Sequence, residues 1–103
     1  MFAILRVLNF SRMFKFDWDK QKAIVNYQKH GVSFPESATV FDDPFAVTRY
    51  DPLHSQEEDR FVTIGYSDRY RLLVVIHTER GYNTRIISSR PATNQEKKYY
   101  DSN

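Results

Sequence analysis

The sequence of 103 residues contains no cysteine. This absence excludes a disulfide scaffold, a thiolate zinc site, an iron–sulfur cluster and catalysis by a cysteine nucleophile. The sequence also lacks a glycine-rich phosphate-binding loop, a dinucleotide-binding fingerprint and a His-Glu-x-x-His metal motif, so nothing in it indicates a nucleotide cofactor. Any catalytic chemistry therefore uses the side chains of His, Lys, Arg, Asp, Glu, Ser, Thr or Tyr.

Long hydrophobic runs are absent as well. The apolar stretch from Phe2 to Leu8 is interrupted by Arg6, whereas a bilayer-spanning helix needs about 20 apolar residues. The same stretch has no cleavage site of a signal peptide, so we expect a cytoplasmic protein without membrane association. A regular pattern begins only at Met13. We expect residues 1–12 to be a misassigned start or an N-terminal extension, and residues 13–103 to form a single domain.

Opposite charges are concentrated in different parts of the chain, although its net charge is only +2. Between Glu36 and Asp59 there are seven acidic residues and one arginine, whereas between Arg60 and Lys98 there are eight basic residues and three acidic ones. A basic half suits a polyanion and an acidic half suits a basic protein partner. Ordinary solvated faces of both signs fit the same counts.

The N-terminal part of the domain shows the pattern of a strand followed by a helix. Residues 14–18 alternate aromatic and polar side chains, which predicts a strand with one buried face. Asp19 is a typical N-cap for a helix over residues 20–30, and Gly31 follows where a left-handed residue ends a helix.

The remaining elements complete an α+β domain. Ser33 and Glu36 have the spacing of a capping box, so a second helix begins there, and it ends at the Asp-Asp-Pro sequence of residues 42–44. The same spacing at Thr93 and Glu96 predicts a short C-terminal helix. Helices covering one face of an antiparallel sheet of about four strands are therefore expected. The expected later strands cover residues 45–50, 60–66, 71–78 and 84–89.

Basic side chains form the most coherent candidate site. Lys22, Asn26 and Lys29 recur on one face of the first predicted helix. Arg85 lies inside the last predicted strand and Arg90 just after it, on the chain that leads to the terminal helix. An arginine inside a strand belongs either to a solvent-facing or to a ligand-facing surface.

Other titratable residues are open to two interpretations. Glu58 and Arg60 are two positions apart, so they share a face if the strand begins early, and they form either an ion pair or an acid beside a charge stabiliser. His30, His54 and His77 match no spacing of metal ligands, and we expect no metal site.

Several motifs occur together in a specific order. Lys-His-Gly-Val-Ser-Phe occupies residues 29–34, Ala-Thr-Val-Phe-Asp-Asp-Pro occupies 38–44, Glu-Asp-Arg-Phe occupies 58–61 and Arg-Ile-Ile-Ser-Ser-Arg occupies 85–90. This combination resembles the BrnT family of type II toxins over residues 14–100. Lys20 stands where that family usually has proline, and Pro91 interrupts the run after the last motif.

The resemblance implies a RelE-like fold and a ribonuclease, free of metal and cofactor, that inhibits translation by cutting RNA. It also implies a partner, a BrnA-like ribbon-helix-helix antitoxin that neutralises the toxin. Toxin and antitoxin together would repress their shared operon, so the toxin would contact operator DNA only as part of the toxin–antitoxin complex. A catalytically inactive module of the same fold that binds RNA or the antitoxin is the alternative.

Metal-free RNA cleavage requires a base at the 2′-hydroxyl, positive charge around the phosphorus and an acid at the 5′-oxygen. We expect Arg85 and Arg90 to stabilise the negative charge of the transition state. Lys22 would hold a flanking phosphate or assist proton transfer. His30 and Glu58 are the candidates for acid or base, although a histidine near a helix C-terminus also satisfies free carbonyls there.

Four further side chains are expected to bind RNA. Lys29 and Asn26 share the basic helix face, and Arg60 adds a cation beside the strands. Tyr99 either stacks on a base or packs against the sheet.

Overall fold

Five strands form one mixed sheet in the computed structural model, which describes residues 15–103. The strand order is β1-β5-β4-β3-β2; β2 to β5 are antiparallel to their neighbours, and β1 runs parallel to β5. The expected α+β class is confirmed. The sheet differs from the expected one because it has five strands instead of about four, its edge strand is parallel, and the C-terminal helix packs on the face opposite the two N-terminal helices. The expectations for residues 1–12 concern a segment outside the described residues. The strands are β1 (Lys15–Asp17), β2 (Val47–Tyr50), β3 (Phe61–Tyr66), β4 (Leu72–Arg80) and β5 (Asn83–Pro91).

The first helix, α2 (Lys20–His30), has both predicted caps. The side chain of Asp19 accepts a hydrogen bond from the backbone N–H of Lys22 at 2.9 Å. At the other end, Gly31 has a φ of 69°, a left-handed conformation that costs glycine little, and its N–H donates to the carbonyl of Tyr27. These caps confirm the predicted helix.

The other helices also begin where capping residues predict. Ser33 caps α3 (Phe34–Ala38), which continues as a 3₁₀ turn, η1 (Thr39–Asp42). The predicted capping box is only half formed there, because the Glu36 carboxylate bonds Arg71 and Ser67 instead of the N–H of Ser33. The reciprocal hydrogen bonds of a capping box open α4 (Asn94–Asp101). The second predicted helix is therefore shorter than its apolar stripe indicates, because its last turn tightens.

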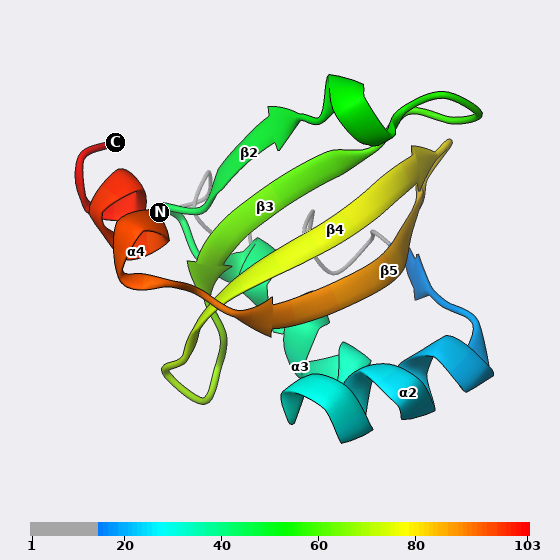
Figure 1. Ribbon diagram of the computed structural model, residues 1–103, viewed down its shortest axis with the longest axis horizontal. Helices are drawn as coiled ribbons and strands as arrows, with labels where there is room; N and C mark the ends of the chain where they lie inside the picture. Colours follow the sequence, from blue (N-terminus) through cyan, green and yellow to red (C-terminus); the bar gives the residue numbers. More distant parts are fainter. Residues whose placement is uncertain (1–14) are drawn as a thin grey trace, which may run out of the picture.

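Hydrophobic cores lie on both sides of the sheet, and β4 contributes to each. On one side, α2 and α3 pack against the sheet. The buried cluster there consists of Leu73, Val75 and Ile86 of the strands together with Val32, Phe34 and Val40. On the other side, Val74 packs with Val62, Ile64 and Tyr100, and α4 covers one end of this face (Figure 1). We call this second side the open face, because no helix within residues 15–103 covers its other end.

A β-bulge at Ile87 decides which side chains of β5 share the open face. Ile86 pairs with His77 and Ser88 pairs with Ile76, so Ile87 is an extra residue in β5. In a regular strand, Arg85 and Arg90 would point to opposite faces, because an odd number of positions separates them. The bulge turns both arginines toward the open face.

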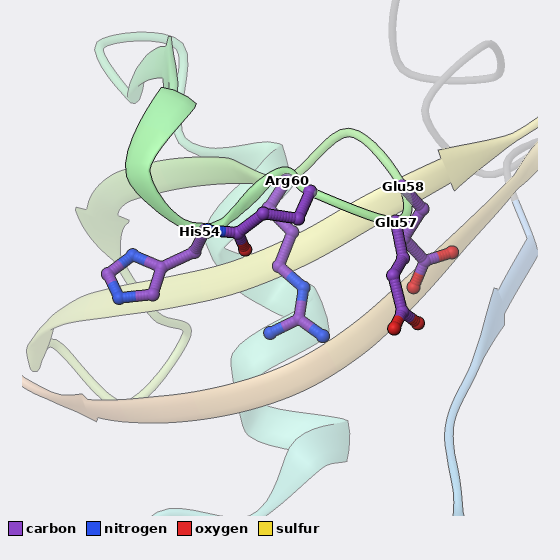
Figure 2. A pocket seen from close by; sticks show the side chains of 5 residues that line it. His54, Glu57, Glu58 and Arg60 are labelled. Atoms are coloured by element: carbon purple, nitrogen blue, oxygen red, sulfur yellow. The ribbon is translucent and has the colours of Figure 1, made fainter.

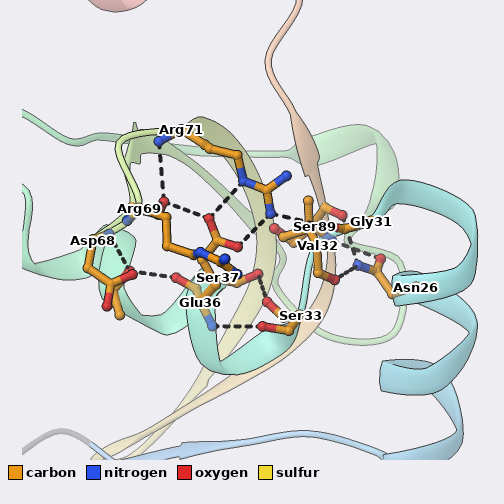
Figure 3. A network of polar contacts seen from close by, with 12 residues as sticks. Asn26, Gly31, Val32, Ser33, Glu36, Ser37, Asp68, Arg69, Arg71 and Ser89 are labelled. Carbon is orange, nitrogen blue, oxygen red and sulfur yellow. Dashed lines mark hydrogen bonds and ion pairs between the residues drawn. The ribbon is translucent and has the colours of Figure 1, made fainter.

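An ion pair between the buried Glu36 and the partly exposed Arg71 joins the helices to the β3–β4 turn (Figure 3). The Glu36 carboxylate accepts hydrogen bonds from Arg71 (Nε, 3.0 Å) and from the hydroxyl of Ser67 (2.7 Å). Arg71 also donates to the carbonyl of Gly31 at 3.1 Å, at the end of α2. The Arg71 hydrogen bond lowers the pKa of Glu36, so this buried carboxylate stays ionised.

A hydrogen-bonded chain crosses β2 to β5 on the helix-covered face. It runs from Thr48 through Thr63 to Nε2 of His77, and Nδ1 of His77 donates to Glu79, which also accepts from Thr84. Burial lowers the pKa of His77, which favours the neutral imidazole. His77 is thus a core histidine that binds neighbouring strands together.

Candidate active site

A row of polar side chains crosses the open face where β3 begins and β4 ends. Thr78 pairs with Arg85, and Phe61 pairs with His77. Continuing that register by one residue places Arg60 beside Thr78 on the side opposite Arg85. The row therefore reads Arg60, Thr78, Arg85, so a threonine stands between two arginines.

Glu58 lies among three arginines at this end of the sheet. Its carboxylate accepts a hydrogen bond from Nη2 of Arg80 at 2.9 Å. This hydrogen bond, together with the positive charges of Arg80, Arg60 and Arg85, lowers the pKa of Glu58. We call Arg60, Arg80 and Arg85 with Glu58 the arginine cluster. Asp17 is a further neighbour, 3.4 Å from Nη1 of Arg85.

A pocket of about 320 Å³ opens at the cluster, lined by His54, Gln56, Glu57, Glu58 and Arg60. Figure 2 shows Arg60 reaching over the sheet, with His54 on one side of it and Glu57 and Glu58 on the other. His54 ends a short 3₁₀ turn, η2 (Pro52–His54), and its Nδ1 donates to Asp51 at 2.8 Å. Asp51 thereby fixes the orientation of the imidazole, and Nε2 is the ring nitrogen that does not contact Asp51.

The predicted residues of α2 form a second group, separate from the arginine cluster. Lys22, Lys29 and His30 line a pocket of about 330 Å³ together with Ile87 and Ser88 of β5. We call this pocket the α2 groove. It meets the open face at Ser88. Ser88 pairs with Ile76 and Arg85 pairs with Thr78, so the two lie about 7 Å apart along the sheet at roughly 3.3 Å per residue of β4.

Asn26 also borders the α2 groove, but its side chain is buried (Figure 3). Its amide group donates to the carbonyls of Val32 (3.0 Å) and Ser89 (2.9 Å), and its carbonyl accepts from the N–H of Ser89 (3.1 Å). The side chain therefore pairs with the edge of β5 as a neighbouring strand would. These bonds occupy its hydrogen-bonding groups within the chain and fix α2 to the sheet.

Arg90 and Tyr99 lie toward the α4 end of the open face. Arg90 makes two hydrogen bonds to the carboxylate of Glu96, each of 2.8 Å, which hold β5 to the start of α4. The guanidinium of Arg49 on β2 lies 5.8 Å from the ring centre of Tyr99, a cation–π contact.

Glu96→Gln is expected to lower the free energy of unfolding by about 1 kcal/mol at pH 7, because the partly exposed pair with Arg90 is lost while glutamine keeps the capping hydrogen bond. The Arg90 hydrogen bonds lower the pKa of Glu96 from 4.5 to about 2. The stabilisation is therefore complete above pH 4.5 and disappears as the pH falls toward 2. Urea denaturation across this range measures it, and a constant difference between the two proteins would contradict the ion-pair contribution.

Sequence reasoning missed His54 and Arg80 as site residues. In the sequence, His54 is notable only as a possible metal ligand, and Arg80 falls in a turn of the predicted meander. Their place depends on the segment between β2 and β3, which folds back beside β4. The sequence contains one indication of this arrangement. Glu58 and Arg60 are two positions apart, so two charged side chains share a face where this segment enters β3.

Two possible features are absent from the part of the chain that the structure describes. No group of three or more His, Asp or Glu side chains within residues 15–103 is arranged to hold a metal ion. In the same residues, no helix has the length and apolar character needed to cross a membrane.

The domain is a small α+β domain, and its open sheet face carries several arginines around one carboxylate. A positively charged surface of this kind is typical of proteins that bind polyanions. A model of the family described as the ribonuclease toxin BrnT of type II toxin–antitoxin systems matches residues 18–96. The chain therefore belongs to the BrnT ribonuclease toxin family. Members of a type II system have a cognate antitoxin.

A solved structure supports the same assignment. The chain is similar to the crystal structure of the ribonuclease toxin BrnT of Brucella abortus, with 25% sequence identity and a TM-score of 0.59. The match covers 79% of this chain and 99% of the Brucella protein. Comparison with curated protein sequences gives no significant match.

Proposed function

We propose that this chain is a metal-independent ribonuclease that acts in the cytoplasm and inhibits translation by cutting RNA. Family membership supports the ribonuclease activity. The observation that carries the finer proposal is the arginine cluster, in which three cations surround one ionised carboxylate beside an oriented histidine. Such a site supplies positive charge and proton transfer from side chains alone.

In this mechanism, Arg60 and Arg85 hold the phosphate that is cut. Guanidinium groups match phosphate oxygens with paired hydrogen bonds and remain protonated at every physiological pH. Negative charge grows on the phosphate oxygens as the 2′-oxygen attacks the phosphorus. Arginines already placed beside these oxygens stabilise the transition state more than the ground state.

Glu58 and His54 divide the proton transfers between them. Glu58 is ionised, so it accepts the proton of the 2′-hydroxyl, and His54 in its protonated form gives a proton to the departing 5′-oxygen. The products are a 2′,3′-cyclic phosphate and a 5′-hydroxyl. When the phosphate engages Arg80, Glu58 loses its strongest hydrogen bond and becomes a stronger base. The positions of the two residues on either side of Arg60 suit an in-line displacement.

The α2 groove extends the RNA-binding surface. Lys22, Lys29 and His30 would bind phosphates that flank the cut, since the groove meets the open face at Ser88. Asn26 positions α2 through its bonds to β5 and is left out of the RNA contacts. Arg90 holds α4 through Glu96, and Tyr99 at that end of the face would contact an RNA base.

The antitoxin is proposed to be a BrnA-like ribbon-helix-helix protein. It would cover the toxin and repress the shared operon together with it, so that this chain meets operator DNA only within the complex. Expression of the chain with and without the neighbouring small reading frame tests this pairing: growth arrest with RNA decay is expected alone and relief is expected with the neighbour.

The reaction is tested with purified protein and a labelled RNA, with and without EDTA. Cleavage is expected to be unaffected by EDTA, whereas Glu58→Gln and His54→Gln are each expected to slow it by about 100- to 10,000-fold. Asp59→Asn is the matched control, because Asp59 is an exposed neighbouring acid whose carboxylate, within residues 15–103, accepts a hydrogen bond only from Tyr50. Loss of cleavage in EDTA would reject metal independence. RNA binding without cleavage would favour the inactive-module alternative.

A further inference from the structure

Two buried hydroxyl groups have no hydrogen-bond partner in the part of the chain that the structure describes. They are Oγ1 of Thr78 and Oγ of Ser89, and both residues are 1% exposed. A buried hydroxyl without a partner destabilises a protein, and native structures retain few of them. Valine would fill nearly the same volume as threonine without this penalty, so the retained hydroxyl of Thr78 needs an explanation.

The two hydroxyls differ in what surrounds them. Ser89 pairs with Val75 on the helix-covered face, where α2 lies against β5. Thr78 lies on the open face, between Arg60 and Arg85 of the arginine cluster in the strand register. Only Thr78 is therefore next to groups that bind an anion.

The geometry points to Thr78 as a substrate-binding residue whose hydroxyl donates a hydrogen bond to the phosphate held by Arg60 and Arg85. This inference rests on the proposed ribonuclease function and names a further contact in the same site. The two arginines supply charge, and the hydroxyl supplies a neutral donor from the sheet itself. Because threonine is branched at Cβ and its strand is central, the donor has few orientations to lose when the phosphate binds.

The burial of Thr78 determines how far below the protein surface a phosphate must bind to reach its hydroxyl. Since Thr78 is 1% exposed, a phosphate reaches its hydroxyl only if the side chains above it move aside. Among residues 15–103, Arg85 forms one ion pair, of 3.4 Å to Asp17, and about a third of its side chain is exposed, so it moves at little cost. RNA binding would thus draw Arg85, the cross-strand neighbour of Thr78, from Asp17 to the phosphate.

The test compares Thr78→Val with Thr78→Ser and with Ser89→Ala, which removes the other orphan hydroxyl away from the cluster. Thr78→Val is expected to lower kcat/KM for RNA by about 10- to 100-fold, the effect of one hydrogen bond to a charged group, and to raise the melting temperature. Thr78→Ser is expected to keep most of the activity. Ser89→Ala is expected to cleave at the wild-type rate.

Binding is measured in parallel with an oligonucleotide that carries 2′-deoxyribose throughout and cannot be cut by this chemistry. Thr78→Val is expected to weaken its binding, whereas Ser89→Ala is not. If the wild-type protein binds this probe but cuts no RNA, the ribonuclease proposal fails and the binding arm still tests Thr78. Equal affinity and equal kcat/KM for wild type and Thr78→Val would overturn the inference. A lower melting temperature in Thr78→Val would overturn it as well, since the hydroxyl would then have a partner within the fold.

Discussion

Replacing Arg85 by alanine is expected to lower kcat/KM for RNA cleavage by about 100- to 1,000-fold, the effect of removing one hydrogen-bond donor from a developing negative charge. The melting temperature should change little, because the only ion pair of Arg85 within residues 15–103 is the long contact to Asp17. Steady-state cleavage assays and thermal denaturation of the same preparations measure the two effects.

Two further variants separate charge from geometry at this position. Arg85→Lys keeps the cation but loses the paired hydrogen bonds, so it should recover only part of the activity. Arg69→Ala is the matched control, because Arg69 is an exposed arginine in the β3–β4 turn, away from the cluster. Equal cleavage by Arg85→Ala and the wild-type protein would remove Arg85 from the proposed mechanism.

Replacing Asn26 by aspartate is expected to lower the free energy of unfolding by at least about 2 kcal/mol. The change removes two donated hydrogen bonds and leaves the carbonyls of Val32 and Ser89 facing a buried carboxylate. Each buried polar group that loses its partner costs about 1–3 kcal/mol. Urea denaturation at pH 7 measures the change, and acid should reduce it as the new carboxylate becomes protonated.

Gln28→Glu is the matched control for Asn26→Asp. It makes the same change from amide to carboxylate on α2, but Gln28 is exposed, so the free energy of unfolding should stay nearly constant. Folded Asn26→Asp should still cut RNA at a rate close to that of the wild type. Normal stability combined with a loss of RNA binding would instead support the RNA-contact role that the sequence pattern had indicated for Asn26.

The helix ends could be predicted because capping is local. Asp19 and Lys22 are three residues apart, and so are Thr93 and Glu96, so each interaction is visible in a short stretch of sequence. The parallel partner of β1 could not be predicted in this way. Lys15 pairs with Asn83, and nothing in the alternation of residues 14–18 specifies a strand so far along the chain.

The candidate site could be predicted only in part. Glu58, Arg60 and Arg85 were each singled out from the sequence, and the structure brings them together. The basic face of α2 was also visible from helical spacing, but periodicity does not reveal that Asn26 turns inward to pair with β5. That outcome depends on how close the helix lies to the strand edge.

The sequence by itself determined the α+β class, the helix ends and, through its ordered motifs, the family. These properties follow from interactions between close neighbours or from residue identities alone. Only the tertiary structure decided which cations share a surface. The bulge at Ile87 turns Arg85 and Arg90 to one face, and the pairing of β3 with β4 and of β4 with β5 places Arg60, Thr78 and Arg85 in one row. Strand register is set by contacts between distant segments, so no local pattern contains it.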